Sequence, residues 1–545
     1  MDEYSPDVAI IGGGLGGCAA ALAVARAGRT CVLTEACDWI GGQLTAQAVP
    51  PDEHGWIEGF GCTATYRRLR EEVRQHYRRW YPLTPAARAD PRLNPGNGWV
   101  SPLCHEPRAA LAVLHGMLAP HQSSGRVVLL AEHEPVGAEL AGREHVRAVR
   151  LRCRRTGEEV RVASPYTLDA TPLGDLLPLA GVEHVTGQEA RSQTGEPSAP
   201  QVARPGNVQA FSVCFAMDYR EGEDHTLPRP ADYDFWRAYV PQLTPPWPGP
   251  LLSWSGVHPR TMETVTYHFH PHREEPRAFA GLWTYRRILD RGLFEPGAFA
   301  SDICLVNWPL LDYWQGDLAG ATPAERAAHV ERARQQSRCV LYWLQTEAPR
   351  PDGGQGWPGL RLRGDVTGGR LGLAREPYIR ESRRIQAEFT VCEGHVAQAC
   401  RPDETLAERF ADSVGIGYYR IDLHPSTGGD NFVDVASLPF QIPLGALIPV
   451  RVENLLPAAL DIGTTHITNG CYRLHPVEWN IGEAAGALAA WCLERGTTPR
   501  QVYRRRDLRA AFQQALVVWG VELRWPAGLR LEDGDPHVHA MDRPA

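Results

Sequence analysis

The chain has 545 residues, of which 43% are hydrophobic and 22% are charged. These fractions are ordinary for a globular protein, and the length predicts two or three substructures. The formal net charge of −8 argues against a nucleic-acid-binding surface. The sequence contains no lysine, so reactions that need a Schiff-base lysine are excluded.

The 13 cysteines contain no CxxC pair; the closest pairs are Cys31/Cys37 and Cys392/Cys400. This spacing is not typical of an iron–sulfur or zinc site, so we expect no metal. No apolar run approaches the ~18 residues that a membrane-spanning helix needs. Because no apolar leader precedes the first motif, we expect a reducing, cytoplasmic location.

The first predicted elements form a strand, a glycine turn, a helix and a second strand. Residues 8–11 are an apolar run typical of a buried parallel strand, and an alanine-rich helix is predicted over 18–27. A second strand over 30–34 ends at Glu35. The positions of a G-x-G-x-x-G motif are filled by Gly12, Gly14 and Gly17. This order of elements is the context that a dinucleotide-binding motif requires.

Each residue of this motif has a physical task. Gly12 permits the tight turn, Gly14 lets backbone approach a pyrophosphate, and Gly17 lets the helix and strand pack closely. The helix N-terminus offers free N–H groups and a partial positive charge to phosphates. Glu35 can accept hydrogen bonds from both ribose hydroxyls and would repel a 2′-phosphate. The motif therefore predicts a dinucleotide with an unphosphorylated adenosine.

A paired-glycine loop, Gly41-Gly42-Gln43, follows the second strand. Beyond it, helices are predicted over 66–81 and 107–118, and strands over 127–132, 146–152 and 166–171. We interpret the strands over 127–132 and 146–152 as bracketing a turn.

Tryptophan, proline and tyrosine become dense between residues 181 and 411, which we interpret as a β-rich inserted substrate domain. Residues 283–289 are strand-like and 329–346 helical. No second G-x-G-x-x-G follows a strand. The predicted cofactor domain comprises 5–180 and 412–495, and the remainder, 496–545, is a C-terminal helix and tail. A solvated tail explains His537 and His539 better than a metal site does.

Several blocks together resemble one family. They are 11–17 with Glu35 and 41–43, then 169–171 with 174–175, 380–385, 412–417, 465–470, 473–476 and 480–486. The chain resembles the bacterial FAD-dependent oxidoreductases of the glutathione-reductase-like flavoprotein superfamily, and more narrowly a family whose members are sometimes labelled xanthan lyase. Pro172 departs from the superfamily's usual Ala-Thr-Gly, and Gly174 follows two residues later.

The resemblance implies an α/β fold: a Rossmann-like, glutathione-reductase-like FAD-binding domain of discontinuous segments with a β-rich insertion. It implies FAD, with the adenosine on Glu35 and a helix beginning near Asn480 that caps the flavin. The expected FAD contacts are Gly12, Gly14, Leu15, Gly17, Glu35, Ala36, Gly41, Gly42, Gln43, Leu44, Val136, Ala170, Thr171, Asp175, Asp461, Asn480 and Ile481.

The candidate catalytic residues cluster late in the chain. They are His466, Arg473, His475 and His424, with His466 as the first choice for acid–base work. Arg380 and Arg383 are candidates for binding an anionic substrate group. Each has a structural alternative: His475 could cap a turn, and the arginines could form ion pairs with nearby glutamates.

The favoured reaction is hydride transfer between a small organic substrate and flavin N5, with oxidation of C–OH or C–N preferred. A fumarate-reductase-like alkene reductase, a hydroxylase that binds NAD(P)H transiently and a non-catalytic flavin-binding subunit stay open. Electrons would pass to O₂, a quinone or a partner protein. Homodimerisation stays open, and nothing in these residues supports a lyase.

Overall fold

A five-stranded parallel sheet forms the centre of this computed structural model, which describes residues 2–271 and 280–534. Its order is β21 (Leu455–Pro457), β8 (Tyr166–Asp169), β2 (Val8–Ile11), β3 (Cys31–Glu35) and β4 (Val127–Ala131). All four neighbouring pairs are parallel. β2 lies in the middle and is apolar throughout because both its faces are covered. The predicted strands over 8–11 and 30–34 are thus confirmed, within a Rossmann-like arrangement.

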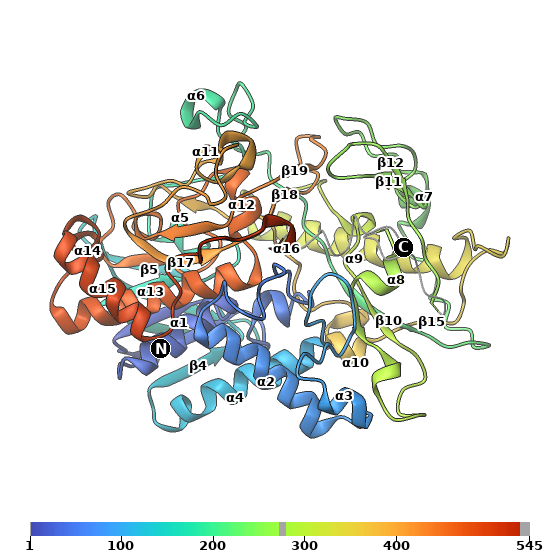
Figure 1. The fold of residues 1–545 in the computed structure, drawn as a ribbon, viewed down its shortest axis with the longest axis horizontal. Coiled ribbons are helices and arrows are strands. Elements are labelled where there is room, and N and C mark those ends of the chain that lie inside the picture. Colours follow the sequence, from blue (N-terminus) through green and yellow to red (C-terminus); the bar gives the residue numbers. More distant parts are fainter. Residues whose placement is uncertain (1, 272–279, 535–545) are drawn as a thin grey trace.

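Two helices pack against each other beside this sheet (Figure 1): α1 (Leu15–Arg26) and α13 (His475–Arg495). A Cβ on Gly482 would lie 2.0 Å from the carbonyl oxygen of Gly16, so only glycine allows this approach. Gly12 makes the turn before α1 with φ +107°, and a Cβ there would lie 2.2 Å from the oxygen of Ala170. The first turn of α1 is therefore in contact with α13, which lies more than 450 residues further along the sequence.

The start of α13 corrects one prediction. The helix was expected to begin near Asn480, but it begins at His475, with Pro476 in its first turn. Proline is tolerated there because the first N–H groups of a helix need no intrahelical acceptor. The first turn that faces the glycine loops therefore carries His475 and Glu478, whereas Asn480 lies in the second turn.

A second correction concerns the strands over 127–132 and 146–152, which do not bracket a turn. Glu132, the residue after β4, has φ +62°, and the chain leaves the parallel sheet there. A separate sheet has the order β1 (Asp2–Tyr4), β7 (Glu159–Ala163), β6 (His145–Cys153) and β5 (His133–Ala141). The hairpin partner of β6 is β5, a strand that sequence analysis missed.

The other long helices are α2 (Ala64–Trp80), α4 (Pro107–Ser123), α9 (Pro323–Thr346) and α15 (Arg506–Val518). The first two confirm the helices predicted over 66–81 and 107–118. The predicted C-terminal helix is divided at Arg505 into α14 (Pro499–Arg504) and α15. His537 and His539 lie outside the described residues.

The middle of the chain, most of which Figure 1 shows on the right, forms a second hydrophobic core. Its sheet has the order β13 (Arg287–Leu289), β14 (Ile303–Val306), β10 (Phe215–Tyr219) and β15 (Leu360–Leu362). Residues 282–285 form the helical turn α8 (Leu282–Tyr285), so only the end of the strand predicted over 283–289 is correct. The 24-residue helix α9 begins six residues earlier than predicted, where Thr322 and Glu325 form a capping box.

Most of the tryptophans expected to mark a substrate domain are buried in this core, including Trp236, Trp283, Trp308 and Trp343. The core also takes in Leu173 and Phe432, which lie outside residues 181–411. The domain boundaries therefore stay a prediction.

The remaining elements are short. The two-stranded sheets pair β11 (Ser255–Val257) with β12 (Thr264–Thr266), β9 (His184–Val185) with β16 (Arg384–Ile385), β17 (Ser413–Gly417) with β20 (Phe440–Pro443), and β18 (Ile421–Leu423) with β19 (Val433–Val435). The short helices are α3 (Pro85–Ala89), α5 (Leu176–Leu179), α6 (Arg191–Thr194), α7 (Tyr233–Ala238), α10 (Gly364–Thr367), α11 (Glu393–Val396), α12 (His466–Tyr472) and α16 (Leu531–Gly534). The 3₁₀ turns are η1 (Gly42–Leu44), η2 (Arg291–Leu293), η3 (Pro309–Leu311), η4 (Arg370–Gly372), η5 (Gln398–Cys400) and η6 (Leu444–Leu447).

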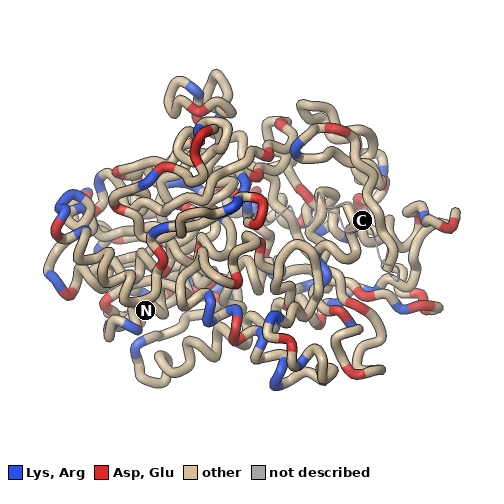
Figure 2. The backbone as a smooth tube through the Cα atoms, viewed as in Figure 1, with Lys and Arg blue, Asp and Glu red and all other residues tan. Residues whose placement is uncertain are grey.

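Acidic and basic residues are intermingled over both halves of the molecule (Figure 2). Across residues 2–271 and 280–534, none of the helices is long and apolar enough to cross a membrane.

Candidate functional site

The glycine turn after β2 contacts Glu35, the last residue of β3. The amide of Gly13 donates to one carboxylate oxygen of Glu35 at 2.9 Å, and the amide of Cys37 donates to the other at 3.0 Å. Burial raises the pKa of Glu35 to about 7. Glu35 and the adjoining Ala36 thus lie beside the turn, where the motif predicts the ribose.

The second glycine loop folds back onto the first through η1. The amide of Gly41 donates to the carbonyl of Gly13 at 2.7 Å. The side-chain amide of Gln43 donates to the carbonyl of Arg473 at 3.0 Å, and Leu44 is buried beside it. The loop after β3 and the segment before α13 therefore meet at the N-terminus of α1.

Other predicted contact residues lie at the carboxyl ends of neighbouring strands, where ligands bind in such sheets. Ala170 and Thr171 follow β8, and Asp461 lies four residues beyond β21; all three are buried. One carboxylate oxygen of Asp461 has no partner among the described residues. Burial and the nearby Asp169 raise the pKa of Asp461 well above its ordinary value.

Three further predicted residues lie at the margin of this region. Val136 is half-buried at a bulge of β5, a strand that begins two residues after Ala131. Asn480 faces β17, where its side-chain amide donates to the carbonyl of Val414 at 3.1 Å. Ile481 is fully buried in α13.

His475 is held as a neutral imidazole with a defined tautomer. The amide of Asp52 donates to its Nδ1 at 3.0 Å, so Nδ1 is an acceptor. Burial lowers the pKa of His475 to about 4. The proton therefore stays on Nε2, which is buried and has no acceptor among the described residues.

A buried polar cluster lies next to His475, and most of its members were not among the site residues predicted from the sequence. Arg473 donates to the hydroxyl of Tyr378 at 3.1 Å and pairs with Asp422 at 3.2 Å. Arg286 pairs with Asp52 at 3.2 Å. The hydroxyl of Tyr378 accepts from Arg473, and its own hydrogen has no acceptor among the described residues.

His424 continues this cluster toward the second core. Its Nδ1 lies 2.7 Å from Asp312, and its Nε2 lies 3.7 Å from Asp422. Burial opposes ionisation of Asp312, but His424 and Arg380 outweigh it and lower the pKa of this carboxyl. The side chain of His424 is 20% exposed. Arg380 pairs with Asp312 at 3.1 Å and covers the ring of Tyr378.

His466 occupies a closed, buried network. Its Nδ1 contacts both oxygens of Glu381, at 2.9 and 3.0 Å, and its Nε2 faces the side-chain amide of Gln188 at 3.4 Å. Arg384 pairs with Glu381 at 2.6 Å and with Glu189 at 2.9 Å. Burial opposes it, but His466 and Arg384 lower the pKa of Glu381 to about 2. Both imidazole nitrogens are engaged.

Arg383 lies apart from these groups. It pairs at 3.2 Å with Asp175, a predicted cofactor residue, and Arg326 of α9 pairs with the same carboxylate at 3.0 Å. The structure thus joins a predicted substrate residue to a predicted cofactor residue in one ion-pair group.

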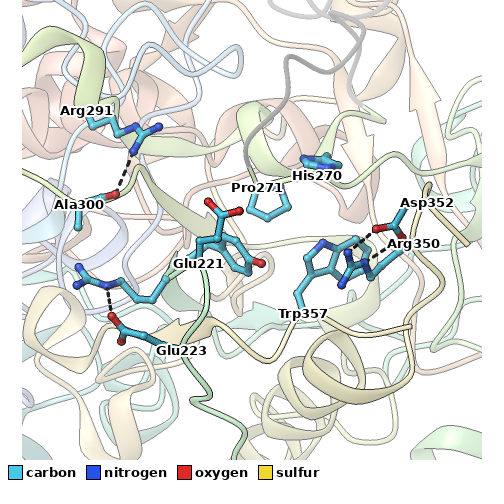
Figure 3. A pocket seen from close by; sticks show the side chains of 11 residues that line it. Glu221, Glu223, His270, Pro271, Arg291, Ala300, Arg350, Asp352 and Trp357 are labelled. Atoms are coloured by element: carbon cyan, nitrogen blue, oxygen red, sulfur yellow. Dashed lines mark hydrogen bonds and ion pairs between the residues drawn. The ribbon is translucent and has the colours of Figure 1, made fainter. Parts of the chain in front are cut away.

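A pocket of about 690 Å³ lies in the second core region (Figure 3). It is lined by Tyr219, Arg220, Glu221, Glu223, His270, Pro271, Arg291, Ala300, Arg350, Asp352 and Trp357. Arg220 pairs with Glu223, and Arg350 with Asp352. None of these residues belongs to the glycine loops or to the His424 cluster. In the described part of the chain, no group of three or more His, Cys, Asp or Glu side chains could hold a metal ion.

Comparison with known proteins identifies the class. A family model described as FAD dependent oxidoreductase matches residues 7–516. The chain belongs to this family. The protein is therefore an FAD-dependent oxidoreductase, as its glycine motif and its parallel sheet lead one to expect. None of the curated proteins matches the chain.

Several solved structures show partial likeness to this chain. They include L-proline dehydrogenase from P. horikoshii (16% identity, TM-score 0.17, 34% of this chain and 24% of that one). The myxobacterial chondrochloren halogenase CndH has 16% identity, TM-score 0.22 and coverages of 42% and 46%. The flavin-dependent monooxygenase PieE in complex with FAD and substrate has 19% identity and a TM-score of 0.24, with coverages of 40% of this chain and 36% of that one. The chain spans less than half the length of each, and these values carry no argument about its reaction.

The residues present fit FAD. Buried polar atoms without partners among the described residues gather around the two glycine loops and the start of α13. They are Gln43 Oε1, Asp461 Oδ2, Arg473 Nε and His475 Nε2. Buried polar groups normally have hydrogen-bond partners, so these atoms are available to a polar ligand such as FAD.

Proposed function

We propose that this oxidoreductase oxidises a C–OH or C–N bond of a small organic substrate, with His424 as the base. Bound FAD supplies the two-electron acceptor. The observation that carries the proposal is the pair of His424 and Asp312, 2.7 Å apart, within the cluster that reaches Arg473 and His475 beside the glycine loops.

Specific groups would hold FAD. Glu35 would accept from the ribose hydroxyls, and the N-terminus of α1 would receive the pyrophosphate. Asp461, Gln43 and His475 keep unpartnered polar atoms for the flavin half. A neutral His475 with its proton on Nε2 can donate a hydrogen bond to an acceptor at that end.

The tautomer of His424 suits a base. Because the pKa of Asp312 is low, its carboxylate accepts from Nδ1–H of His424. The lone pair is then on Nε2, which has no hydrogen-bond partner among the described residues and belongs to a partly exposed side chain. Asp422, 3.7 Å from Nε2, would stabilise the imidazolium once the proton arrives. Our proposal thus moves the base from His466 to His424.

The substrate's polar group would bind at Tyr378. Its hydroxyl hydrogen lacks an acceptor, and burial raises its pKa although Arg473 opposes this shift, so the phenol remains a donor at neutral pH. An oxygen of the substrate can satisfy that donor. Electrons would then pass to O₂, a quinone or a partner protein.

A second candidate is reduction of an unsaturated carboxylate, which Arg286, Arg380 and Arg473 favour. Each of these arginines already has an acidic partner, Asp52, Asp312 or Asp422. This pairing weakens the case for binding a dicarboxylate, and we therefore prefer oxidation.

The test is anaerobic reduction of the FAD-loaded protein by a panel of alcohols, sugars, amines and acids. The proposal expects one class of reductant to remove the oxidised flavin absorbance. Reduction by NAD(P)H alone would favour a hydroxylase or reductase instead. Reoxidation by an unsaturated carboxylate, with no response to alcohols or amines, would favour the alkene reductase.

A further inference from the structure

The carboxyl group of Glu478 lies at the N-terminus of α1. Glu478 is the fourth residue of α13 and is only 5% exposed. Its Oε1 lies 3.3 Å from the amide nitrogen of Gly16, and its Oε2 accepts from the side-chain amide of Gln43. A Cβ built on Gly14 would lie 3.3 Å from the same Oε1. An acidic side chain of the protein thus contacts the turn that is expected to receive pyrophosphate.

Two anions therefore need the same donors. The N-terminus of a helix binds phosphate through free N–H groups and a partial positive charge, and in this fold the pyrophosphate of the dinucleotide lies there. The amide of Gly16 is one of those groups, because it belongs to the second residue of α1. A charged Glu478 beside a bound pyrophosphate would be strongly repelled, since like charges interact strongly where water is excluded.

No cation relieves this conflict among the described residues that act on Glu478. The groups that face it are the amide of Gly16 and the thiol of Cys18 from α1, Gln43 from η1, and Asp461 beyond β21. Glu35, at the end of β3, is a further acidic group that acts on the thiol of Cys18. Burial raises the pKa of Glu478 to about 7, although Gly16 and Gln43 oppose this shift.

We propose that Glu478 is a proton-linked ligand of FAD. In the FAD-free protein its carboxylate accepts from the amide of Gly16. In the FAD-bound protein the carboxyl group is protonated and donates its O–H to a pyrophosphate oxygen. Binding of FAD then takes up one proton from solvent, and no other bond forms or breaks.

This linkage has a definite sign. The added negative charge of FAD raises the pKa of Glu478 further above its value in the free protein. Above about pH 7, the free protein must gain a proton to bind, so the Kd for FAD rises toward about tenfold per pH unit. Well below pH 7 the group is already protonated, and its contribution to the pH dependence disappears.

The experiment measures FAD binding, not turnover. FAD is removed from the purified protein, and rebinding is titrated by flavin fluorescence between about pH 6 and pH 9. Wild type is expected to show the rise in Kd above pH 7. Glu478→Gln keeps an N–H donor but cannot ionise, so its Kd for FAD is expected to lose this rise.

The matched control is Glu483→Gln. Glu483 is also a buried acid of α13, but its carboxylate accepts from Thr65 and does not contact the turn. This variant should keep the wild-type pH profile. Calorimetry at about pH 8 in two buffers of different ionisation enthalpy should show uptake of about one proton by wild type and by Glu483→Gln.

A wild-type profile that is flat above pH 7, or one that Glu478→Gln reproduces in full, overturns the proposal. If Glu478→Gln does not fold, the calorimetric measurement on wild type decides alone, because absence of proton uptake contradicts the linkage directly. The proposal rests on FAD binding and not on the identity of the base, so its failure would leave the role of His424 untouched.

Discussion

The two candidate basic histidines of this oxidoreductase, His466 and His424, have opposite surroundings. His466 is buried between Glu381 and Gln188, with both ring nitrogens engaged. His424 is tied to Asp312 through one nitrogen, and its side chain is 20% exposed. Closeness in sequence to the cofactor-binding strands favours His466 as the base, whereas the availability of a ring nitrogen favours His424.

The difference shows that the ion-pair group around His466 is suited to a structural role and the one around His424 to binding a substrate. One group consists of four largely buried side chains that pair with one another: Glu381, His466, Arg384 and Glu189. Removal of one member would leave another buried charge without its partner. In the His424 cluster, Tyr378 keeps a donor and His424 keeps an acceptor without a hydrogen-bond partner among the described residues. A substrate could complete the second group but not the first.

The largest expected effect is on the rate of flavin reduction in His424→Ala. Loss of a general base typically lowers a rate by about 10²–10⁴-fold. Anaerobic stopped-flow reduction with the best substrate measures it, and FAD content should equal that of wild type. A rate within threefold of wild type would remove His424 from the proposed role.

Glu381→Gln should chiefly affect stability. Breaking a buried pair costs about 3–5 kcal/mol, and the free energy of unfolding from urea titration should fall by that amount. Glu376→Gln is the control, because Glu376 pairs with Arg154 at the surface and such pairs contribute only about 0–1 kcal/mol. Equal losses in both variants would contradict the closed-network account.

The ion pairs of Glu381 also predict that the free energy of unfolding depends on pH. The pKa of Glu381 is about 2 in the folded protein and near 4.5 in the unfolded chain, so its stabilisation is complete above pH 4.5 and is lost as pH falls toward 2. The shift corresponds to roughly 3 kcal/mol. The difference in unfolding free energy between wild type and Glu381→Gln should therefore shrink below pH 4.5. A difference that stays constant down to pH 3 would show that the Glu381 charge does not matter.

The smallest effect on rate is expected for His466→Asn. Leaving a buried group without its partner costs about 1–3 kcal/mol of stability, so the melting temperature should fall. The reduction rate of the folded, FAD-loaded fraction should stay within tenfold of wild type. A folded variant that retains FAD and loses 100-fold or more in rate would restore His466 as the base.

The glycine turn could be predicted because its constraints are local. Gly12, Gly14 and Glu35 lie within one strand–helix–strand unit, and their spacing reflects the turn itself. The early start of α13 at His475 was missed because small residues from Trp479 onward dominate the helical pattern, although Pro476 marks the first turn.

The polar cluster had no such local signal. Asp52, Arg286, Asp312, Tyr378 and Asp422 lie in five separate segments, and only tertiary packing brings them together. Sequence order likewise gave no reason to pair Glu381 with His466. The residue types could be anticipated, but which histidine would keep an available nitrogen could not.

The most direct test of the central claim compares two asparagine variants in one experiment. FAD-loaded His424→Asn and His466→Asn are reduced anaerobically by the same substrate, and the first-order rate constants are compared with wild type at one pH. The account predicts a loss of about 100-fold or more for His424→Asn and less than tenfold for His466→Asn. The reverse order, with both proteins folded and loaded with FAD, would contradict it.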